Sequence, residues 1–394
     1  MAARGFGAAR QGIYWHFGQR KVIFPMPFSR RNFLIAAGAA VTARGVLPAA
    51  AQQPPQQQPP RPNMDVWTGP DQPYPYQTAR STVALVKGES SRRKNITDAL
   101  VAIDDQILPV LKTKKYVVLK PNCVSTVALG TTNAESLMGI LDYLAPRFKG
   151  QVVIAESCGN ALANFEALGY QKILEQHRSQ NVSLVDLNIE AKYQVIPVFD
   201  YDTHVVPVRL AARLQDPDAY IICCSVMKTH NAQLATLSVK NMVLGAPLSA
   251  APKVTPRWSD KRKFHVGIRM MQVNMMLAAT KLKPFWGAAV IDGFEGMEGN
   301  GPHAGTPVPH RIAVASTDYI AADRVGVEAM GIDPGWVGSL VYCYQAGLGQ
   351  YNLDKIDIRG EKVADVKRTY KLSIDADREK QWMGPMEELP VKLG

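Results

Sequence analysis

Short apolar runs alternate with segments of helical periodicity through most of the chain. The runs are rich in β-branched residues and predict strands, whereas apolar residues that recur every three to four positions predict amphipathic helices. Asn95 and Asn133 stand at the starts of the first two helices, where an asparagine side chain caps free backbone N–H groups. The strands are predicted at 81–86, 116–119, 151–155 and 182–187, and the helices at 96–111, 134–148 and 165–176.

The middle of the chain departs from this alternation. Residues 193–199 and 204–209 are strand-like and are separated by Asp200-Tyr201-Asp202, which predicts an antiparallel hairpin. Residues 220–226 form an apolar run with Ser225 as its one polar residue, as in a strand that is buried on both faces. Downstream, strands are predicted at 286–291, 311–315 and 355–359, and helices at 236–244, 266–281, 319–330 and 336–346.

This pattern predicts an α/β fold with a mainly parallel, doubly wound (Rossmann-like) sheet and a small antiparallel hairpin insertion. The α/β domain is predicted to span residues 79–362 and to be followed by a polar C-terminal tail at 363–394. Residues 52–78 contain eight Pro and seven Gln and few aliphatic residues, so we expect a disordered linker there.

Positive charge is concentrated before that linker. The chain holds 45 Lys and Arg against 34 Asp and Glu, a net charge of +11. Residues 1–51 contribute seven of the basic residues and no acidic one, which leaves the remainder close to +4. So mild a charge does not indicate a nucleic-acid partner, and none is expected.

The first 51 residues resemble an export leader. Ser29-Arg30-Arg31-Asn32-Phe33-Leu34 is similar to the twin-arginine (Tat) pattern, an apolar run follows to Ala43, and Ala49-Ala50-Ala51 offers a cleavage site. The run is shorter than the roughly 20 residues that a membrane span needs, so no stable span is expected after cleavage. We therefore expect a Tat signal peptide at 26–51, the twin-arginine translocation machinery as a partner and a periplasmic or extracellular location. Met26 is an alternative start, in which case residues 1–25 are an over-extended reading of the gene.

Polar side chains follow the predicted strands. In open parallel sheets, ligands bind beyond the carboxyl ends of the strands, so these residues are candidates for a common site. They are Lys120 and Asn122 after the second strand, Glu156 and Ser157 after the third, Lys228, His230 and Asn231 after the apolar run, and Lys240 and Asn241 in the helix that follows it.

Lysines in this set would hold an anion, and His230 would transfer a proton or bind a metal. We predict Lys120, Lys228 and His230 as catalytic residues, with Lys228 and His230 reaching one pocket from an irregular turn. The alternative for that segment is an ordinary surface loop. The basic stretch 253–263, which contains Lys261, is either a solvated loop or a lid over an anionic ligand. The predicted ligand-binding residues are Asn122, Glu156, Ser157, Asn231, Lys240 and Asn241.

Asp292, Glu295 and Glu298 stand in a Gly-rich segment that we expect to be a loop. Three carboxylates joined by flexible backbone suit Mg²⁺ or Ca²⁺, so they are predicted metal ligands and a divalent metal is a candidate cofactor. The alternative is that they pair with the lysines in a salt-bridged acid–base cluster.

Several short motifs occur together between roughly residues 80 and 335, namely Val118–Asn122, Ala155-Glu156-Ser157, Lys228-Thr229-His230, Thr236–Asn241, Asp292–Pro302, Ala315–Asp318 and Ala322-Asp323. On these motifs the chain resembles the domain of unknown function 362 family. Some members that are similar in this core carry ferredoxin-type iron–sulfur segments, and this chain departs from them. Its five cysteines show no C-x₂-C-x₂-C spacing, so no iron–sulfur cluster is expected. The family supplies no activity.

The cysteines themselves fall into two groups. Cys223-Cys224 lies in the long apolar run and is predicted to belong to the core. Cys123 and Cys158 follow two neighbouring strands and would approach each other. A disulfide, a pair of ligands for a soft metal and two unrelated thiols all remain open.

Three functions are compatible with these features. The first is an exported enzyme that acts on a small anionic molecule through a lysine, histidine and carboxylate site, with or without a divalent metal. The second is a non-catalytic periplasmic ligand-binding or accessory protein that uses the same pocket. The third is a redox protein related to the iron–sulfur members of the family. No dinucleotide-binding, P-loop, α/β-hydrolase or zincin motif is present.

Overall fold

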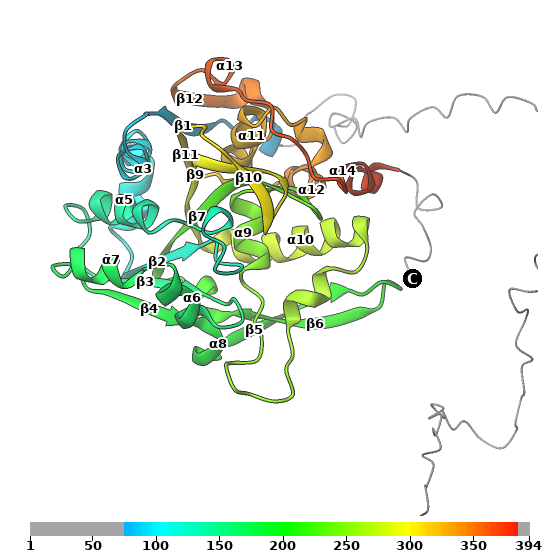
Figure 1. Ribbon diagram of the computed structural model, residues 1–394. Coiled ribbons are helices and arrows are strands. Elements are labelled where there is room, and N and C mark those ends of the chain that lie inside the picture. Colours follow the sequence, from blue (N-terminus) through cyan, green and yellow to red (C-terminus); the bar gives the residue numbers. More distant parts are fainter. Residues whose placement is uncertain (1–74, 385–394) are drawn as a thin grey trace, which may run out of the picture. The chain divides into compact units, whose positions relative to one another are not determined.

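The computed structural model describes residues 75–384 as a large sheet covered by helices, with a separate two-stranded sheet beside it (Figure 1). The strands are β1 Ser81–Lys87, β2 Tyr116–Pro121, β3 Gln151–Glu156, β4 Val182–Asp186, β5 Tyr193–Phe199, β6 Val205–Ala211, β7 Ala219–His230, β8 Leu234–Thr236, β9 Trp286–Asn300, β10 Ala304–Val308, β11 Ile312–Ser316 and β12 Ile356–Gly360. The helices are α2 Pro75–Thr78, α3 Arg92–Val101, α4 Asp104–Leu111, α5 Ala134–Leu144, α6 Ala161–Ala167, α7 Gln171–Gln176, α8 Leu187–Glu190, α9 Ser238–Leu244, α10 Ile268–Leu282, α11 Tyr319–Ala329, α12 Gly338–Gln345, α13 Val363–Val366 and α14 Ala376–Glu379.

The large sheet is mostly parallel. Its main strands run in the order β12-β1-β11-β9-β7-β2-β3-β4, with β10 paired to the far part of β9 and β8 paired to the end of β7. β9, β7, β2, β3 and β4 are parallel to one another, and β1 is parallel to β12. Among these main strands, β11 runs against both of its neighbours, β1 and β9. The predicted α/β class with a mainly parallel sheet is therefore confirmed.

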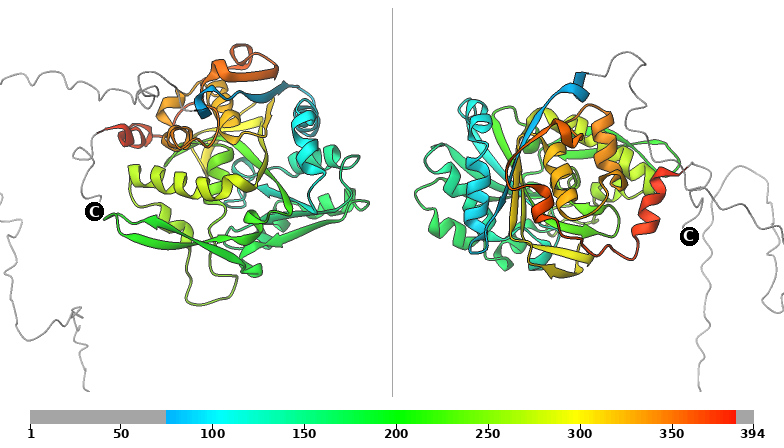
Figure 2. Two further views of the ribbon diagram at one scale, coloured as in Figure 1. Left: turned by 180° about the vertical axis from the view of Figure 1, so that it is seen from behind. Right: turned by 90° about the horizontal axis from the view of Figure 1, so that it is seen from above.

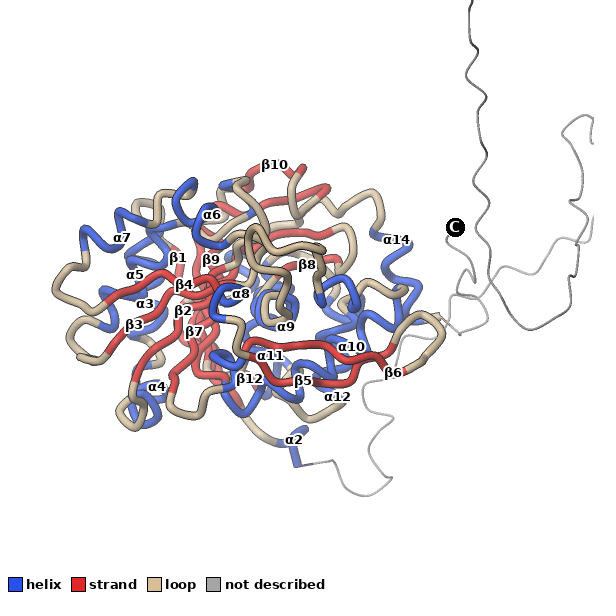
Figure 3. The backbone as a smooth tube through the Cα atoms, turned by 90° about the horizontal axis from the view of Figure 1, so that it is seen from below, coloured by secondary structure: helices blue, strands red, loops and turns tan. Residues whose placement is uncertain are grey.

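Helices cover both faces of this sheet (Figures 2 and 3). α3, α4 and α5 pack on one face, and α9, α10, α11 and α12 pack on the other. Side chains alternate along a strand, so Val117 and Leu119 of β2 join one buried cluster while Val118 joins the other. A strand buried on both faces is apolar at every position, which is why the central strands are visible in the sequence as continuous apolar runs.

The connections change direction across the sheet between β2 and β7. From β2 the chain passes through α5 to β3, whereas from β7 it passes through α9 and α10 to β9, which lies on the other side of β7. α5 packs on one face of the sheet, and α9 and α10 pack on the opposite face. Such a switch point leaves a crevice at the carboxyl ends of the two strands, where ligands bind in open α/β sheets. The ends of β2 and β7 are therefore the candidate location of a ligand site.

β5 and β6 form a separate antiparallel two-stranded sheet, as the hairpin prediction required. Its inner face carries Ile196, Val198 and Val208, which are buried in the larger core cluster. Asn274 of α10 holds one end of the hairpin: its amide nitrogen donates to Phe199 O at 2.7 Å, and its amide oxygen accepts from Phe199 N at 2.8 Å. The hairpin thus packs on α10 and adds no strand to the large sheet.

Two helix starts test the capping predictions. Asn133 caps α5, as predicted, through its side-chain oxygen. The prediction at Asn95 is wrong, because α3 begins at residue 92 and Ser91 caps it. The first turn, Arg92-Arg93-Lys94, has no apolar residue and so cannot be found from apolar periodicity. Asn95 lies inside the helix, where its amide donates to Gly88 O at 2.9 Å.

Both ends of the described body extend beyond the predicted boundaries. Residues 75–78, predicted as disordered linker, form α2, and Tyr76 lies edge-on against Tyr344 with ring centroids 5.7 Å apart. Residues 363–384 of the predicted polar tail pack on the body, where Val363 and Tyr370 are buried in the larger core cluster. Widely spaced apolar positions in a polar stretch leave no periodic pattern, so the sequence alone does not show this packing.

The remaining predicted segments at the two ends of the chain lie outside the described residues. That applies to the signal peptide at 26–51, to residues 1–25, to linker residues 52–74 and to residues 385–394. Between residues 75 and 384, no helix is both long enough and apolar enough to cross a membrane.

Candidate functional site

The switch point between β2 and β7 brings most of the predicted site residues together. Lys120 lies near the end of β2, Glu156 ends β3, and Lys240 lies in α9 just after β7 and β8. Lys228 and His230 belong to β7 itself and not to an irregular turn, because β7 continues past the sheet edge and pairs with β8. Parallel strands end at one edge, so side chains far apart in sequence meet here.

Lys120 is fully buried, and each of its three N–H groups has an acceptor. Its Nζ donates to Glu156 Oε2 at 2.7 Å, to Pro121 O at 2.8 Å and to Asn241 Oδ1 at 3.0 Å. An ammonium group has three donors, so none remains for a ligand. Lys120 is a structural ion-pair partner across the ends of β2 and β3, and it has no donor left for the catalytic role that the sequence predicts.

The predicted ligand-binding residues near Lys120 form a buried network. Glu156 Oε1 accepts from Ser157 N at 2.8 Å, and Asn122 Nδ2 donates to Asn241 Oδ1 at 3.1 Å. Ser157 Oγ donates to Gly245 O at 2.7 Å. These contacts fix the ends of β2, β3 and α9 relative to one another. Asn122 Oδ1 makes no hydrogen bond within residues 75–384 and is the one oxygen of this network that is free to face a ligand.

Three lysines lie beside this network, and none forms an ion pair with a carboxylate in the described part of the chain. Burial lowers the pKa of one of them, Lys261, and the charge of Glu156 opposes this shift. Lys228 is fully buried, and its ammonium donates to Gly130 O. Lys240 is 9% exposed and Lys261 is half-buried, and neither ammonium makes a hydrogen bond or ion pair among residues 75–384. Lys228 and Lys261 are close enough to Lys240 to lower its pKa. Lys228, Lys240 and Lys261 are called the lysine cluster below.

Burial and mutual repulsion disfavour the charged forms of these lysines. Burial first, and then the charge of Lys261, lowers the pKa of Lys228 to about 7. Burial, followed by the charges of Lys228 and Lys261, lowers the pKa of Lys240 well below its usual range. A negative charge placed among the three would favour their protonated forms and raise these pKa values again. The lysine cluster is therefore suited to an anion.

His230 lies at the end of β7 beside the lysine cluster. Its Nδ1 accepts a hydrogen bond from Ala232 N at 2.9 Å, so the proton of the neutral ring sits on Nε2. Burial, followed by the charges of Lys240 and Lys228, holds the pKa of His230 well below its usual range and keeps the ring neutral. His230 thus offers one Nε2–H donor, which suits binding an anion better than the proton transfer that the sequence predicts.

Two further polar side chains at this edge make no hydrogen bond within the described residues. Gln233 is 3% exposed, and neither atom of its amide has a partner; the same holds for the hydroxyl oxygen of Thr236. Thr236 lies opposite Lys228 in the β7–β8 pair. Buried polar groups are normally hydrogen-bonded, so these atoms are further candidates to contact a ligand. No sequence signal marked Gln233, and Thr236 was marked only as the first residue of the segment Thr236–Asn241 that carries the family resemblance. For Lys261 the basic stretch 253–263 was the signal, and its position supports the lid alternative.

Asn231, the remaining predicted ligand-binding residue, is exposed. It lies in the turn between β7 and β8, and its backbone N–H donates to Gly301 O at 3.1 Å. This bond ties the β7–β8 turn to the turn between β9 and β10. Asn231 therefore stands at the border of the site, and its backbone helps to hold two hairpins together.

The three carboxylates do not meet. The Gly-rich segment that holds them is strand β9, paired with β10, so the prediction of a loop is wrong. Asp292 is buried and bonds Ser136 Oγ at 2.6 Å and Arg92 Nε at 3.0 Å. Glu298 accepts from the backbone of Lys371, and Glu295 is exposed. Glycine is common in flexible loops, but it also occurs in strands where another part of the backbone approaches closely. The glycines of this segment therefore did not distinguish a strand from a loop.

The structure supports neither a metal site at Asp292, Glu295 and Glu298 nor the alternative, a salt-bridged cluster of these carboxylates with the lysines. Among residues 75–384, no three His, Cys, Asp or Glu side chains lie close enough to hold a metal ion together. Asp292 pairs with an arginine, not with a member of the lysine cluster. The cluster is accordingly left without an acidic partner from β9.

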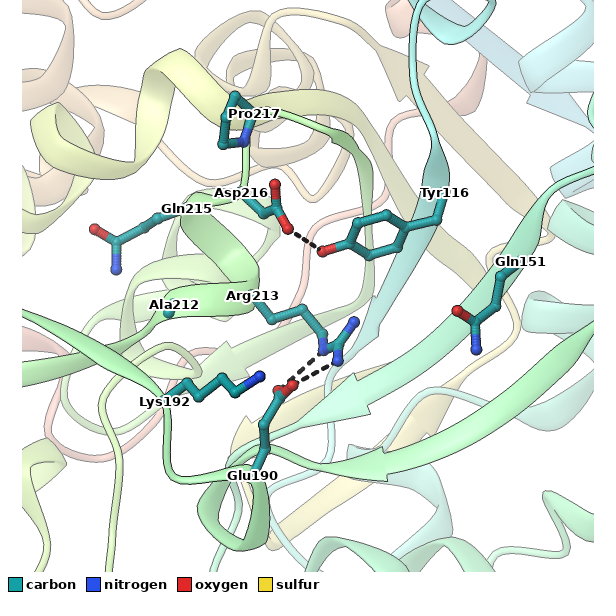
Figure 4. Close-up of a pocket in the computed structure, with 9 residues that line it drawn as sticks. All are labelled: Tyr116, Gln151, Glu190, Lys192, Ala212, Arg213, Gln215, Asp216 and Pro217. Carbon is teal, nitrogen blue, oxygen red and sulfur yellow. Dashed lines mark hydrogen bonds and ion pairs between the residues drawn. The ribbon is translucent and has the colours of Figure 1, made fainter.

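A hollow of about 450 Å³ lies at the opposite edge of the sheet (Figure 4). Tyr116 and Gln151, the first residues of β2 and β3, line it. Three of its four charged side chains are paired: Asp216 accepts from Tyr116 Oη at 2.6 Å, and Arg213 binds both carboxylate oxygens of Glu190 at 2.5 and 3.0 Å. Lys192 also lines the hollow and forms no ion pair among residues 75–384. Because most of these groups are paired and the hollow lies at the amino ends of the strands, the lysine cluster remains the better candidate site.

Comparison with protein families assigns the chain. The family described as domain of unknown function (DUF362) matches residues 117–328, a segment that includes every predicted site residue from Lys120 to Glu298. The chain therefore belongs to the DUF362 family, as the sequence resemblance implied.

Two further comparisons add little. No curated protein matches the chain. A crystal structure of a Thermotoga maritima protein from the Northeast Structural Genomics Consortium matches with 9% sequence identity and a TM-score of 0.35. The match covers 66% of this chain but only 60% of that structure, and a likeness at this TM-score carries no argument.

Proposed function

We propose that this protein is an exported enzyme that acts on a small, multiply charged anion bound by the lysine cluster at the β2–β7 switch point. The observation that carries the proposal is the set of three neighbouring lysines, two of them with no partner among residues 75–384. Clustered buried charge is costly unless an opposite charge neutralises it. A phosphate, a phosphate ester or a polycarboxylate would supply that charge, since each offers several anionic oxygens.

Each residue of the site has a role that follows from its surroundings. Lys240 and Lys261 would hold the anion, because their ammonium groups have all their donors free. His230 would donate from Nε2. Lys228 would donate a proton to the bound molecule, since the anion raises the pKa of Lys228 above its ligand-free value of about 7 and favours the protonated form. The network around Lys120 and Glu156 would keep these groups in place.

Sulfate affinity is expected to fall as the pH rises above 7. The pKa of Lys228 is about 7 in the ligand-free protein, and the pKa of Lys240 is also lowered. Both would rise when an anion binds, so binding above pH 7 requires proton uptake. Each proton taken up weakens binding by about tenfold per pH unit. Calorimetry between pH 6 and 9 measures this slope, and sulfate is the right probe because its charge does not change over that range.

The control is Lys253→Met, which removes an exposed lysine from the same basic stretch as Lys261. This variant should keep the affinity and the pH slope of the natural protein. Lys228→Met should bind sulfate more weakly and with a shallower slope. Sulfate binding that is equally tight at pH 6 and pH 9, or no binding at all, would contradict the proposed site.

Export is the second part of the proposal and is supported by the twin-arginine pattern at Arg30-Arg31. The double substitution Arg30→Lys and Arg31→Lys keeps the charge but removes the arginine pair. We expect it to abolish transfer to the periplasm, as measured by cell fractionation and immunoblotting, while the protein accumulates inside the cell. A periplasmic fraction equal to that of the natural protein would argue against this route.

A non-catalytic binding protein is the second candidate, and the bonding of His230 favours it. Its Nδ1 is already occupied by Ala232 N, so the neutral ring has no free basic nitrogen. Incubation with phosphate monoesters separates the two functions: an enzyme releases a changed product, whereas a binding protein returns the ligand unchanged in native mass spectrometry. A ligand that returns unchanged would overturn the enzymatic half of the proposal and leave the anion site standing.

A further inference from the structure

Two thiols meet at the border of the anion site. Cys123 follows β2 and Cys158 follows β3, each four positions beyond the paired residues Leu119 and Ile154. Their sulfur atoms are 3.5 Å apart, with the Cys158 thiol donating to Cys123 Sγ. Asn164 Nδ2 also donates to Cys158 Sγ at 3.4 Å. The parallel register of β2 and β3 thus places the two cysteines side by side.

This pair differs from the other three cysteines. Cys223 and Cys224 are adjacent on β7 and face opposite sides of the sheet, and Cys343 lies in α12; all three are completely buried. Cys158 is 8% exposed, so a small reagent has partial access to it, whereas Cys123 is 1% exposed. Cys158 is the more accessible residue of the two, and Cys123 lies next to it as a resolving thiol. The hydrogen bond to Cys123, and then burial, raise the pKa of the Cys158 thiol, so it exchanges only through a small thiolate fraction, which grows as the pH rises.

The thiol pair is connected to the lysine cluster. Cys123 N donates to Glu156 Oε2 at 3.3 Å, next to the ion pair with Lys120. The charges of Lys228 and Lys261 both interact with Cys123. The segment that begins at Cys123 also contains Gly130, whose carbonyl accepts from Lys228. A bond between the two sulfurs would therefore join the two strand ends that border the anion site.

We propose that Cys123 and Cys158 form a reversible intrachain disulfide by exchange with a low-molecular-weight disulfide. The Cys158 thiolate attacks one sulfur of the reagent, forming a mixed disulfide and releasing one reagent thiolate. The Cys123 thiolate then attacks Cys158 Sγ, forming the protein disulfide and releasing the second. Two protein thiols and one reagent disulfide become one protein disulfide and two reagent thiols, so the two electrons pass to the reagent and no proton is gained or lost overall. The sulfurs need to approach from 3.5 Å to about 2.05 Å, the length of a disulfide bond.

Oxidised glutathione tests the proposal on the full native chain. Reduced protein is incubated with it, free thiols are blocked by alkylation, and peptides are mapped by mass spectrometry without reduction. We expect a linked pair of peptides, one with Cys123 and one with Cys158, which dithiothreitol separates. Cys123→Ser should instead accumulate glutathione on Cys158, since the resolving thiol is gone. Cys343→Ser is the control and should form the same linked pair as the natural protein.

A second measurement needs no variant. The disulfide closes a span of 35 residues and restricts the unfolded chain, so the oxidised natural protein should melt at a higher temperature than the reduced protein. Free thiols on both cysteines after oxidation, or a link from either to another cysteine, would overturn the proposal. It does not rest on the proposed function: the link is measured by peptide mass and anion binding by calorimetry, so either can fail alone.

Discussion

Lys240→Met is expected to make the ligand-free protein more stable and to abolish its response to sulfate. Lys240 is almost fully buried in α9 and has no hydrogen-bond partner in the described body. Methionine has nearly the same shape and a comparable helix propensity, and it needs no partner. A polar group that is completely buried without a partner costs about 1–3 kcal/mol, and the gain should lie at the low end of this range because Lys240 keeps some contact with solvent. The same change removes a donor to the anion, so stability and binding should move in opposite directions.

Urea unfolding with and without sulfate measures both effects. The natural protein should gain stability from sulfate as a ligand that binds only the folded state, and Lys240→Met should start higher and gain nothing. Lys253→Met, on the exposed surface, should match the natural protein in both conditions. A less stable Lys240→Met protein would show that this lysine serves the fold and would count against an anion site built around it.

The sign of this effect separates a binding residue from a structural one. Residues selected for the fold are stabilising, so replacing them costs stability. Residues selected for a ligand are arranged around a molecule that the free protein lacks, and they can be unfavourable until it binds. The lysine cluster is of the kind that is unfavourable without a ligand, because burial and repulsion lower the pKa values of Lys228 and Lys240.

Most of the fold was predictable because the central strands are buried on both faces. Residues 116–119 are apolar at every position, residues 220–226 are apolar except at Ser225, and such runs stand out in a sequence. The order of the strands was not predictable. β2 pairs with β7, about a hundred residues away in the chain, and nothing in either strand specifies the other. The reversed direction of β11 also depends on the packing of the whole sheet.

The candidate site was predicted in outline but not in its bonding. Lys120 and Lys228 look alike in the sequence, since each lies at the end of an apolar strand. Only the register of β2 with β3 shows that Glu156 faces Lys120, while no carboxylate in the described body pairs with Lys228. Lys261 comes from a distant loop, and local sequence says nothing of where that loop folds back.

Lys120→Met is expected to destabilise the protein by about 3–5 kcal/mol, the usual cost of breaking a buried ion pair by removing one partner. Glu156 is 3% exposed, and its carboxylate would lose the ammonium that neutralises it. The double variant Lys120→Met with Glu156→Gln removes the stranded charge and keeps the side-chain oxygen that Ser157 N uses. It should recover most of the lost stability. Urea unfolding of the natural protein, Lys120→Met, Glu156→Gln and the double variant measures the coupling between the two residues.

The comparison with Lys240→Met makes this test decisive. Both variants replace a buried lysine by methionine at the same edge of the sheet, and both lysines lie next to Asn241 in space or in sequence. Lys120 has three acceptors and Lys240 has none among residues 75–384, so the same substitution should lower stability at one position and raise it at the other. Equal changes in the free energy of unfolding at the two positions would show that the different hydrogen bonding of the two lysines does not affect stability. That result would contradict the distinction between a structural ion pair at Lys120 and an anion site at Lys240.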